Sequence, residues 1–213
     1  MLDIKVIFDT TCPWCFIGKR RLERALSLRP DVRAKFTWWP FLLNKDMPTE
    51  GLDRIDYLTR KFGSKARARR VYGLIAKAGQ SVGIDFNFDR ISRTPNSLGS
   101  HRLIIFAERY GVASVLVERL FINYFYFGRD IGVNSVLCEI AVEVGLDMKK
   151  VEVYLNSSED AEHVYNKNTR AHLLGVNGVP AFVFIDGMLV TGAQEPKVLA
   201  RVLDAAVVNN TTH

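Results

Sequence analysis

The sequence predicts an α/β fold in which one mixed β-sheet is built from both ends of the chain, with a block of helices inserted between its halves. Three observations lead to this prediction. A short apolar stretch, 4–8, opens the chain, helical patterns follow one another from 53 to 155, and strand character returns at 181–191. Strands at the two ends cannot bury themselves separately, so they are expected to pair in a single sheet.

The N-terminal part is predicted to contain a strand, a helix and a second strand. Residues 4–8 are Ile-Lys-Val-Ile-Phe, a short β-branched run that is followed by the turn-prone Asp9-Thr10-Thr11. A helical stretch, 16–26, ends before Pro30. The aromatic-rich stretch 35–42 predicts the second strand.

The middle of the chain is predicted to be helical. Ser or Asp, which are good N-caps, opens several of the runs, and glycine follows several of them, as it does at helix C-termini. The expected domains are a discontinuous one, 1–44 with 165–213, and an inserted helical domain, 45–164. The predicted helices of the insertion are 53–62, 64–78, 97–110, 114–126, 135–144 and 147–155.

A hairpin and a helix are predicted to end the chain. Strand character at 181–185 is followed by the turn signal Asp186-Gly187 and by a partner strand at 188–191. Glu195-Pro196 then opens a last helix with an apolar face, because proline suits the first turn of a helix.

Composition and charge exclude several classes of function. The chain has 213 residues, of which 48% are hydrophobic, enough for a substantial core. The net charge is +6, but the one dense basic run, 65–70, lies in a predicted helix, where a solvent-exposed face is expected rather than a nucleic-acid site. No apolar run reaches the roughly 18 residues of a membrane span. No signal-peptide pattern precedes the first strand, so we expect a cytoplasmic protein without nucleic-acid or membrane partners.

The motif that carries chemistry is Cys12-Pro13-Trp14-Cys15, between the first strand and the first helix. This position is expected to put both cysteines on the first turn of the helix, where the partial positive charge of the helix N-terminus stabilises an anion. The thiolate anion is the nucleophile in disulfide exchange. The motif therefore predicts a redox-active dithiol.

Two other uses of the cysteine pair are less favoured. A zinc site normally takes four ligands, but Cys138 stands alone and the histidines show no ligand spacing to one another. A structural disulfide across two residues would close little chain and constrain little. We therefore predict no metal and a catalytic rather than a structural role.

The motifs together resemble the thioredoxin fold in its DsbA form. The resemblance rests on Cys12-Pro13-Trp14-Cys15 after the first strand, Gly178-Val179-Pro180 before the hairpin, and the helical insertion. Pro95-Asn96-Ser97 followed by Ser100-His101-Arg102 is similar to the FrnE-like branch, which also contains 2-hydroxychromene-2-carboxylate isomerases and kappa-class glutathione transferases. Those isomerases and transferases typically carry Ser at the position of Cys12, so the Cys pair favours a FrnE-like oxidoreductase. The second Cys pair of some FrnE proteins is absent.

Roles for the four motif residues follow from the helix position and the resemblance. Cys12, outermost on the helix, is expected to be exposed and to be the nucleophile, and Cys15, one turn deeper, to resolve the mixed disulfide. Pro13 and Trp14 are expected to set the redox poise and to contact substrate. Packing alone is the alternative for Trp14.

Other residues have an expected place near the cleft. The resemblance implies that Pro180 is a cis-proline that lets the Val179 backbone pair with an extended substrate or with glutathione; a strand-entry proline is the alternative. Asn96 and His101 are candidates for the cleft, where His101 would move a proton, although helix capping and domain tying are favoured for this segment. Cys138 is expected to be a free buried cysteine rather than a resolving one.

The predicted function is that of a thiol–disulfide oxidoreductase. It would act on protein or small-molecule thiols and disulfides, as a monomer or homodimer, without a required cofactor and with glutathione as a redox partner. One alternative is a glutathione-dependent isomerase or transferase, and Cys12 discriminates against it because such enzymes activate the thiol of glutathione. The other is a thiol-dependent chaperone that binds unfolded chains through Trp14 and the cleft.

Overall fold

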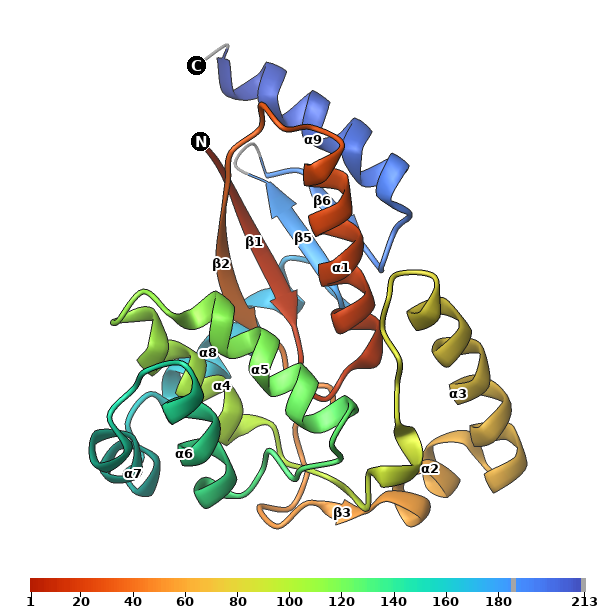
Figure 1. Ribbon diagram of the computed structural model, residues 1–213, viewed down its shortest axis with the longest axis vertical. Helices are drawn as coiled ribbons and strands as arrows, with labels where there is room; N and C mark the ends of the chain where they lie inside the picture. The colour runs from red at the N-terminus through yellow and green to blue at the C-terminus, as the bar shows by residue number, and fades with distance from the viewer. Residues whose placement is uncertain (185–186, 212–213) are drawn as a thin grey trace.

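The main sheet joins the two ends of the chain, as predicted. In the computed structural model, which describes residues 1–184 and 187–211, the strand order is β2-β1-β5-β6 (Figure 1). β1 runs parallel to β2 and antiparallel to β5, so the sheet is mixed. Ile185 and Asp186 of the predicted hairpin lie outside the described residues. The strands are β1 (Leu2–Phe8), β2 (Ala34–Pro40), β5 (Ala181–Phe184) and β6 (Leu189–Thr191).

Alternation along β1 explains why the sheet has a core on each face. Ile4 and Val6 lie in the main core, whereas Ile7 packs with Trp39 and Ala181 in a second apolar cluster. Successive side chains of a strand point to opposite faces, so a central strand with apolar residues at both parities needs cover on both sides. The first face is covered by α1 (Pro13–Ser27) and α9 (Pro196–Thr211), which pack together, and the second by α8 (Ala161–Leu173).

The inserted segment is mostly helical, and it also contains a short two-stranded sheet that the sequence analysis did not predict. β3 (Leu52–Asp53) pairs antiparallel with β4 (Arg93–Thr94). The expectation of an all-helical insertion is therefore wrong in this detail, because two-residue strands are too short to show the alternation of a strand. The remaining elements are α2 (Arg54–Phe62), α3 (Lys65–Gln80), η1 (Phe88–Arg90), α4 (Leu98–Glu108), α5 (Ala113–Phe125), α6 (Asn134–Glu143) and α7 (Met148–Asn156).

The inserted helices form two groups near the N-terminal end of α1. Figure 1 shows α2 and α3 on one side and α4 to α7 on the other, while both chain ends lie at the far end of the sheet. α8 runs without a break across the expected domain boundary between 164 and 165. None of the helices in the described part of the chain is long and apolar enough to cross a lipid bilayer.

The predicted N-caps are present at Asp53, Ser64 and Asp147, but not at the other serines that open predicted helices. Ser97 precedes α4 without a capping hydrogen bond from its side chain, and α5 and α6 begin before Ser114 and Ser135, with Val112 and Val133 as their N-cap residues. The Asp53 carboxylate accepts from the N–H groups of Ile55 and Asp56, and the Ser64 hydroxyl accepts from Arg67 N–H. These contacts satisfy backbone donors that the first turn of a helix leaves unpaired. Gly63 ends α2 in the left-handed conformation, with φ of 80°, which glycine adopts without steric cost.

Candidate active site

The turn between β1 and α1 positions the cysteine pair. Cys12 is the N-cap of α1, in an extended conformation, and Pro13 is its first helical residue. The Cys15 N–H donates to the Cys12 carbonyl at 3.0 Å, so Cys15 lies on the first turn. Proline suits this position because the first helical N–H has no partner within the helix and the fixed φ matches a helix. Both cysteines are free thiols at the helix N-terminus.

Cys12 is buried, so the expectation of an exposed thiol at the helix tip is wrong. Its residue exposure is only 5%. The thiol donates to the Val179 carbonyl oxygen at 3.7 Å, and both cysteines belong to the main apolar cluster. The physical reason is long-range: the loop before β5 comes from the other end of the chain and packs over the helix tip.

Burial also governs Cys15. Loss of solvation raises the pKa of the Cys15 thiol well above its usual value, and the neighbouring Cys12 raises it further. The Asp9 carboxylate adds a smaller effect in the same direction, opposed by a hydrogen bond involving the Asp9 backbone. Cys15 is therefore held as a thiol at neutral pH.

The Val179–Pro180 peptide bond is cis, which confirms the assignment made from the resemblance. Gly192 N–H donates to the Pro180 carbonyl at 2.7 Å and holds the proline at the start of β5. Pro180 also packs against Gly18 of α1, where an added Cβ would lie 2.6 Å from its Cγ. The cis-proline loop thus contacts both Cys12 and the second turn of the same helix.

Trp14 presents a partly open apolar surface next to the thiols. Its exposure of 39% contrasts with the burial of Pro13, Cys12 and Cys15 around it. A large aromatic ring that remains this open at a helix start is available to contact a bound molecule.

Asp9, which the sequence analysis treated only as a turn residue, is a fully buried carboxylate beneath the helix tip. It accepts hydrogen bonds from Thr11 N–H at 2.9 Å, Leu43 N–H at 2.8 Å and the Thr11 and Ser97 hydroxyls. A buried charge is tolerated only when it is hydrogen-bonded or paired, and this set of donors meets that need. An acidic residue that directly follows a buried strand and precedes a reactive cysteine was the signal that could have found it.

Lys61 on α2 is a second residue that the sequence analysis missed. Burial lowers the pKa of its ammonium, but a hydrogen bond to the Tyr57 hydroxyl at 2.8 Å and nearby acidic groups, Cys12 among them, outweigh burial and leave the pKa raised. Tyr57 donates in turn to the Asn44 side chain at 3.0 Å. No motif in the sequence marks this cation near Cys12.

Asn96 and His101 make hydrogen bonds and packing contacts within the protein. Asn96 accepts from Leu98 N–H and donates to the Met47 carbonyl. His101 is buried edge-on against Phe8, with ring centroids 5.3 Å apart. Burial lowers the pKa of His101, with partial opposition from the nearby Asp9 charge and a backbone hydrogen bond with Phe41.

Ser100 and Arg102 tie α4 to its neighbours. The hydroxyls of Ser100 and Thr10 lie 2.7 Å apart. The guanidinium of Arg102 donates to backbone carbonyls in the last turn of α7 and in the residues just after it. It therefore satisfies acceptors that a helix C-terminus leaves unpaired. Those acceptors belong to Tyr154, Leu155, Ser157 and Glu159. These contacts fit the structural role favoured for the segment.

Cys138 lies apart from the motif. It is buried on α6, which packs against α4, α5 and α7, and burial raises the pKa of its thiol. Within the described residues, no group of three or more His, Cys, Asp or Glu side chains is arranged to hold a metal ion.

A strand, two thiols on the first turn of the following helix and a facing cis-proline loop define the thioredoxin-like class, here with helices inserted into the fold. The chain belongs to the DSBA-like thioredoxin domain family, whose sequence pattern matches residues 3–204.

Individual relatives cover nearly the whole chain. The protein YwbO of Bacillus subtilis (strain 168), described as uncharacterized, is 26% identical over 190 residues, which are 88% of this chain and 89% of YwbO. A probable DsbA oxidoreductase from Streptomyces coelicolor superposes with a TM-score of 0.88 and 26% identity, over 97% of this chain and 90% of that chain. The cytosolic disulfide reductase DsbM from Pseudomonas aeruginosa, solved with GSH, has a TM-score of 0.71 and 18% identity, over 97% and 99%.

Proposed function

We propose that the protein is a FrnE-like thiol–disulfide oxidoreductase that works through Cys12 and Cys15. The observation that carries this proposal is the pair of free thiols on the first turn of α1, with Cys12 against the Val179 carbonyl. A helix N-terminus favours an anion, so it stabilises the thiolate on the N-cap residue more than a thiol deeper in the chain.

The proposed reaction has two exchange steps. The Cys12 thiolate attacks one sulfur of a substrate disulfide, forms a mixed disulfide and releases the other sulfur as a thiolate, which takes a proton. Cys15 then loses its proton, attacks the sulfur of Cys12 and releases the second substrate thiolate. Two electrons leave the protein, which ends with a Cys12–Cys15 disulfide. Two molecules of a thiol such as glutathione return the two electrons and leave as their disulfide, and the same steps in reverse oxidise a substrate dithiol.

Burial assigns different tasks to the two thiols. The raised pKa of Cys15 keeps it protonated while Cys12 reacts, so it does not compete as a nucleophile. When the Cys12 sulfur enters a mixed disulfide it loses its charge, and the contribution of Cys12 to the high pKa of Cys15 falls. Cys15 then becomes easier to deprotonate at the moment when it is needed.

Substrate binding is assigned to the surface around the thiols. An extended peptide or glutathione would pair with the Val179 backbone and lie against the open face of Trp14, with Pro13 and Pro180 shaping the contact. Because the Val179 carbonyl now accepts from Cys12, binding there would also expose the sulfur. DsbM, a structural neighbour described as a cytosolic disulfide reductase and solved with GSH, is the reason for including a glutathione partner and a cytoplasmic location in this proposal.

Kinetics with oxidised glutathione test this proposal. The parent should form a transient adduct on Cys12 and then a Cys12–Cys15 disulfide, both resolved by mass spectrometry of quenched samples. Cys15→Ser should stop at the adduct, and Cys12→Ser should lose reduction of insulin disulfides. A Cys12→Ser variant that conjugates an electrophile to glutathione as fast as the parent would place the chain among the transferases instead. Peptide binding without any exchange chemistry would indicate a chaperone.

A further inference from the structure

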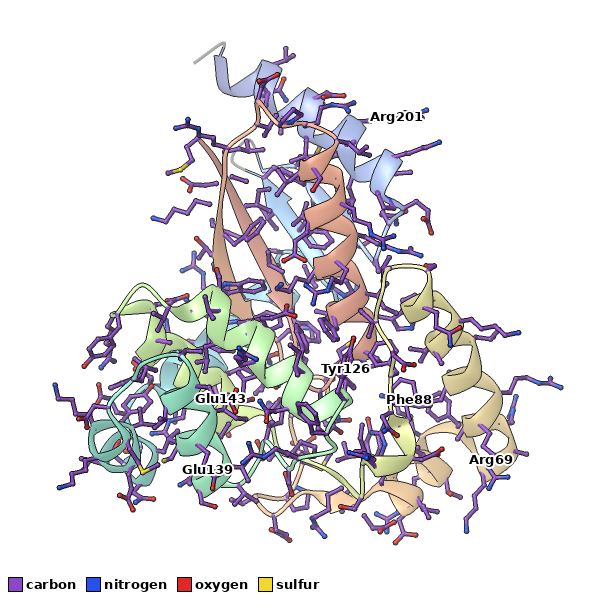
Figure 2. The ribbon with its side chains drawn as sticks, viewed as in Figure 1. Arg69, Phe88, Tyr126, Glu139, Glu143 and Arg201 are labelled. Carbon is purple, nitrogen blue, oxygen red and sulfur yellow. The ribbon has the colours of Figure 1, made fainter. Side chains whose placement is uncertain are left out.

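A cavity of about 480 Å³ lies between α2, α3 and the segment that contains η1 and β4. Its walls are largely apolar, with Leu58, Phe88 and Ile91 among them, and Lys65 and Arg69 also line it. Phe88 and Arg69 are labelled in Figure 2, on the η1 segment and on α3 respectively. Cys12, Trp14, Val179 and Pro180 do not line this cavity, so it is separate from the proposed exchange site.

Arg54, the first residue of α2, lines this cavity with an unsatisfied guanidinium. The residue is only 5% exposed. Its Nη1 donates to the Thr94 hydroxyl at 3.1 Å, but buried Nε and Nη2 have no hydrogen-bond partner among the described residues. The Tyr72 ring lies under the guanidinium, 4.9 Å from Cζ. The Tyr72 hydroxyl interacts with Arg54, which opposes the rise that burial causes in the pKa of Tyr72, but it does not meet hydrogen-bond geometry at Nε or Nη2.

A buried arginine of this kind is costly unless an anion meets it. A charged group that is removed from water and left without a partner lowers the stability of the folded state substantially. Arg102, which is buried to a similar degree, donates to four carbonyls. The Nε of buried Arg21 also lacks a partner, but this guanidinium pairs with Glu195 at 2.6 Å and donates to the Ala193 carbonyl. No carboxylate of the described residues forms an ion pair with Arg54.

The free edge of Arg54 specifies the shape of the missing partner. Nε and Nη2 carry two parallel N–H donors on one side of the planar guanidinium, the fork that matches the two oxygens of a carboxylate. Two acidic residues, Asp53 and Asp89, also line the cavity and would repel a dianion such as phosphate. The Asp53 carboxylate already accepts from the N-terminal N–H groups of α2, so it is committed to the helix.

We propose that this cavity binds a small monocarboxylate with an apolar body. The carboxylate would take both free donors of Arg54, and the apolar body would lie against Leu58, Phe88 and Ile91. Lys65 and Arg69 would attract the anion, since dispersed cations at an entrance raise the local concentration of a ligand of opposite charge. The volume is within the range of roughly 300–1,000 Å³ that small-molecule sites occupy.

Titration calorimetry with named probes tests this proposal. Octanoate and 2-naphthoate represent aliphatic and aromatic carboxylates, 2-naphthamide is the neutral analogue, and inorganic phosphate is the competing anion. We expect at least one carboxylate to bind the parent, and the amide to bind at least tenfold more weakly. Absence of binding by both carboxylates overturns the proposal, as does tighter binding of phosphate or equal binding of the amide.

Variants of Arg54 test whether carboxylate binding depends on the Nε and Nη2 donors of its guanidinium. Arg54→Met should weaken carboxylate binding by at least about 100-fold, since it removes both charge-assisted hydrogen bonds to the ligand. Arg54→Lys keeps the charge but lacks the fork, and it should lose at least about tenfold. Arg70→Met, an exposed α3 residue outside the cavity, is the matched control and should leave affinity unchanged. Unchanged affinity in Arg54→Met overturns the proposal.

Thermal unfolding without ligand separates a binding role from a structural one. Arg54→Met removes a buried charge without a carboxylate partner, so its Tm should equal or exceed that of the parent. Arg102→Met should lower the Tm, because it leaves buried carbonyls unpaired. A fall in Arg54→Met as large as in Arg102→Met would assign Arg54 to the framework and overturn the proposal. The Cys12→Ser, Cys15→Ser double variant should bind carboxylate as the parent does, so the outcome is independent of the exchange chemistry.

Discussion

Gly18 and Pro180 are in such close contact that a methyl group cannot be added between them. A Cβ on Gly18 would lie 2.6 Å from Pro180 Cγ and 3.2 Å from Pro180 Cβ, both inside van der Waals contact. This approach lets the loop before β5 settle on α1 and brings the Val179 carbonyl to 3.7 Å from the Cys12 sulfur. The absence of a side chain at Gly18 therefore helps to set the geometry of the exchange site.

Gly18→Ala should lower both stability and activity. The new methyl group must displace the proline loop or the helix, and overpacking of this kind typically costs about 1–3 kcal/mol. Displacement of the loop should also reduce the rate of insulin disulfide reduction, because Val179 moves relative to Cys12. Urea denaturation and the insulin assay measure the two effects.

Gly73→Ala is the matched control for that substitution. Gly73 lies on α3, and an added Cβ there meets nothing within 4 Å. Alanine is preferred over glycine in a helix by up to about 1 kcal/mol, so this variant should gain stability and keep full activity. If Gly18→Ala behaved like Gly73→Ala, the close contact with Pro180 would have no energetic consequence.

The fold was predictable because its main signals are local. Each of these signals acts within a few residues: the apolar run at 4–8, the hairpin turn near 187, and the N-caps at Asp53 and Ser64. The structure has β1 at the first, places β5 and β6 on either side of the second, and begins α2 and α3 at the two caps. The position of the cysteine pair on the first turn of α1 also follows from sequence order alone.

The environment of the site was not predictable in the same way, because it depends on contacts between distant segments. Cys12 is covered by Val179, which is 167 residues away along the chain. Asp9 is satisfied by Leu43 and Ser97, neither of which a local pattern connects to it. The burial of a helix N-terminus and the set of donors around a buried carboxylate both depend on tertiary structure, so the periodicity of the sequence does not predict them.

Cys138→Ala should leave disulfide exchange intact. Cys138 lies on α6, away from the elements that position Cys12, and burial raises the pKa of its thiol, which disfavours the reactive thiolate. The loss of a small buried side chain should cost about 1 kcal/mol of stability. Stopped-flow reduction of oxidised glutathione should give the same rates as the parent, whereas Cys15→Ala should accumulate the adduct. Slower resolution of the adduct in Cys138→Ala would instead identify Cys138 as a resolving thiol.

Asp9→Asn should destabilise the fold and make Cys15 more acidic. The amide group keeps one acceptor oxygen but turns N–H donors toward the donors of Thr11, Leu43 or Ser97, and an unsatisfied buried polar group costs about 1–3 kcal/mol. The Asp9 charge contributes to the high pKa of Cys15, so its removal should lower that pKa. The pH profile of Cys15 alkylation, measured with Cys12→Ser in both proteins, should shift to lower pH.

Asp3→Asn is the control for the Asp9 substitution. Asp3 lies on β1, the strand that Asp9 follows, but it is exposed and is not among the groups that shift the pKa of Cys15. The variant should match the parent in both urea midpoint and alkylation profile. An unshifted Cys15 profile in a folded Asp9→Asn protein would show that the carboxylate has no influence on the resolving thiol.

His101 should make the fold less stable in mild acid. Burial is the largest cause that lowers its pKa in the folded protein below the usual value of 6.5. Well above pH 6.5 the ring is neutral in both states and contributes no pH dependence. Between 6.5 and the lower folded-state pKa, the unfolded chain binds a proton that the folded protein does not, so falling pH favours unfolding. Below the folded-state pKa both states are charged, and this contribution stops changing.

His101→Phe should remove this part of the pH dependence. The phenyl ring keeps the apolar contact with Phe8 but leaves a backbone hydrogen bond with Phe41 unmade, so absolute stability should fall at every pH. The informative quantity is therefore the slope of the unfolding free energy between pH 7 and 5. One group that takes up a proton only on unfolding changes this slope by at most about 1.4 kcal/mol per pH unit, and His101→Phe should be flatter than the parent by up to that amount. His163→Asn, at an exposed histidine of α8, should keep the parent slope. Equal slopes for the parent and His101→Phe would mean that the buried ring does not resist protonation.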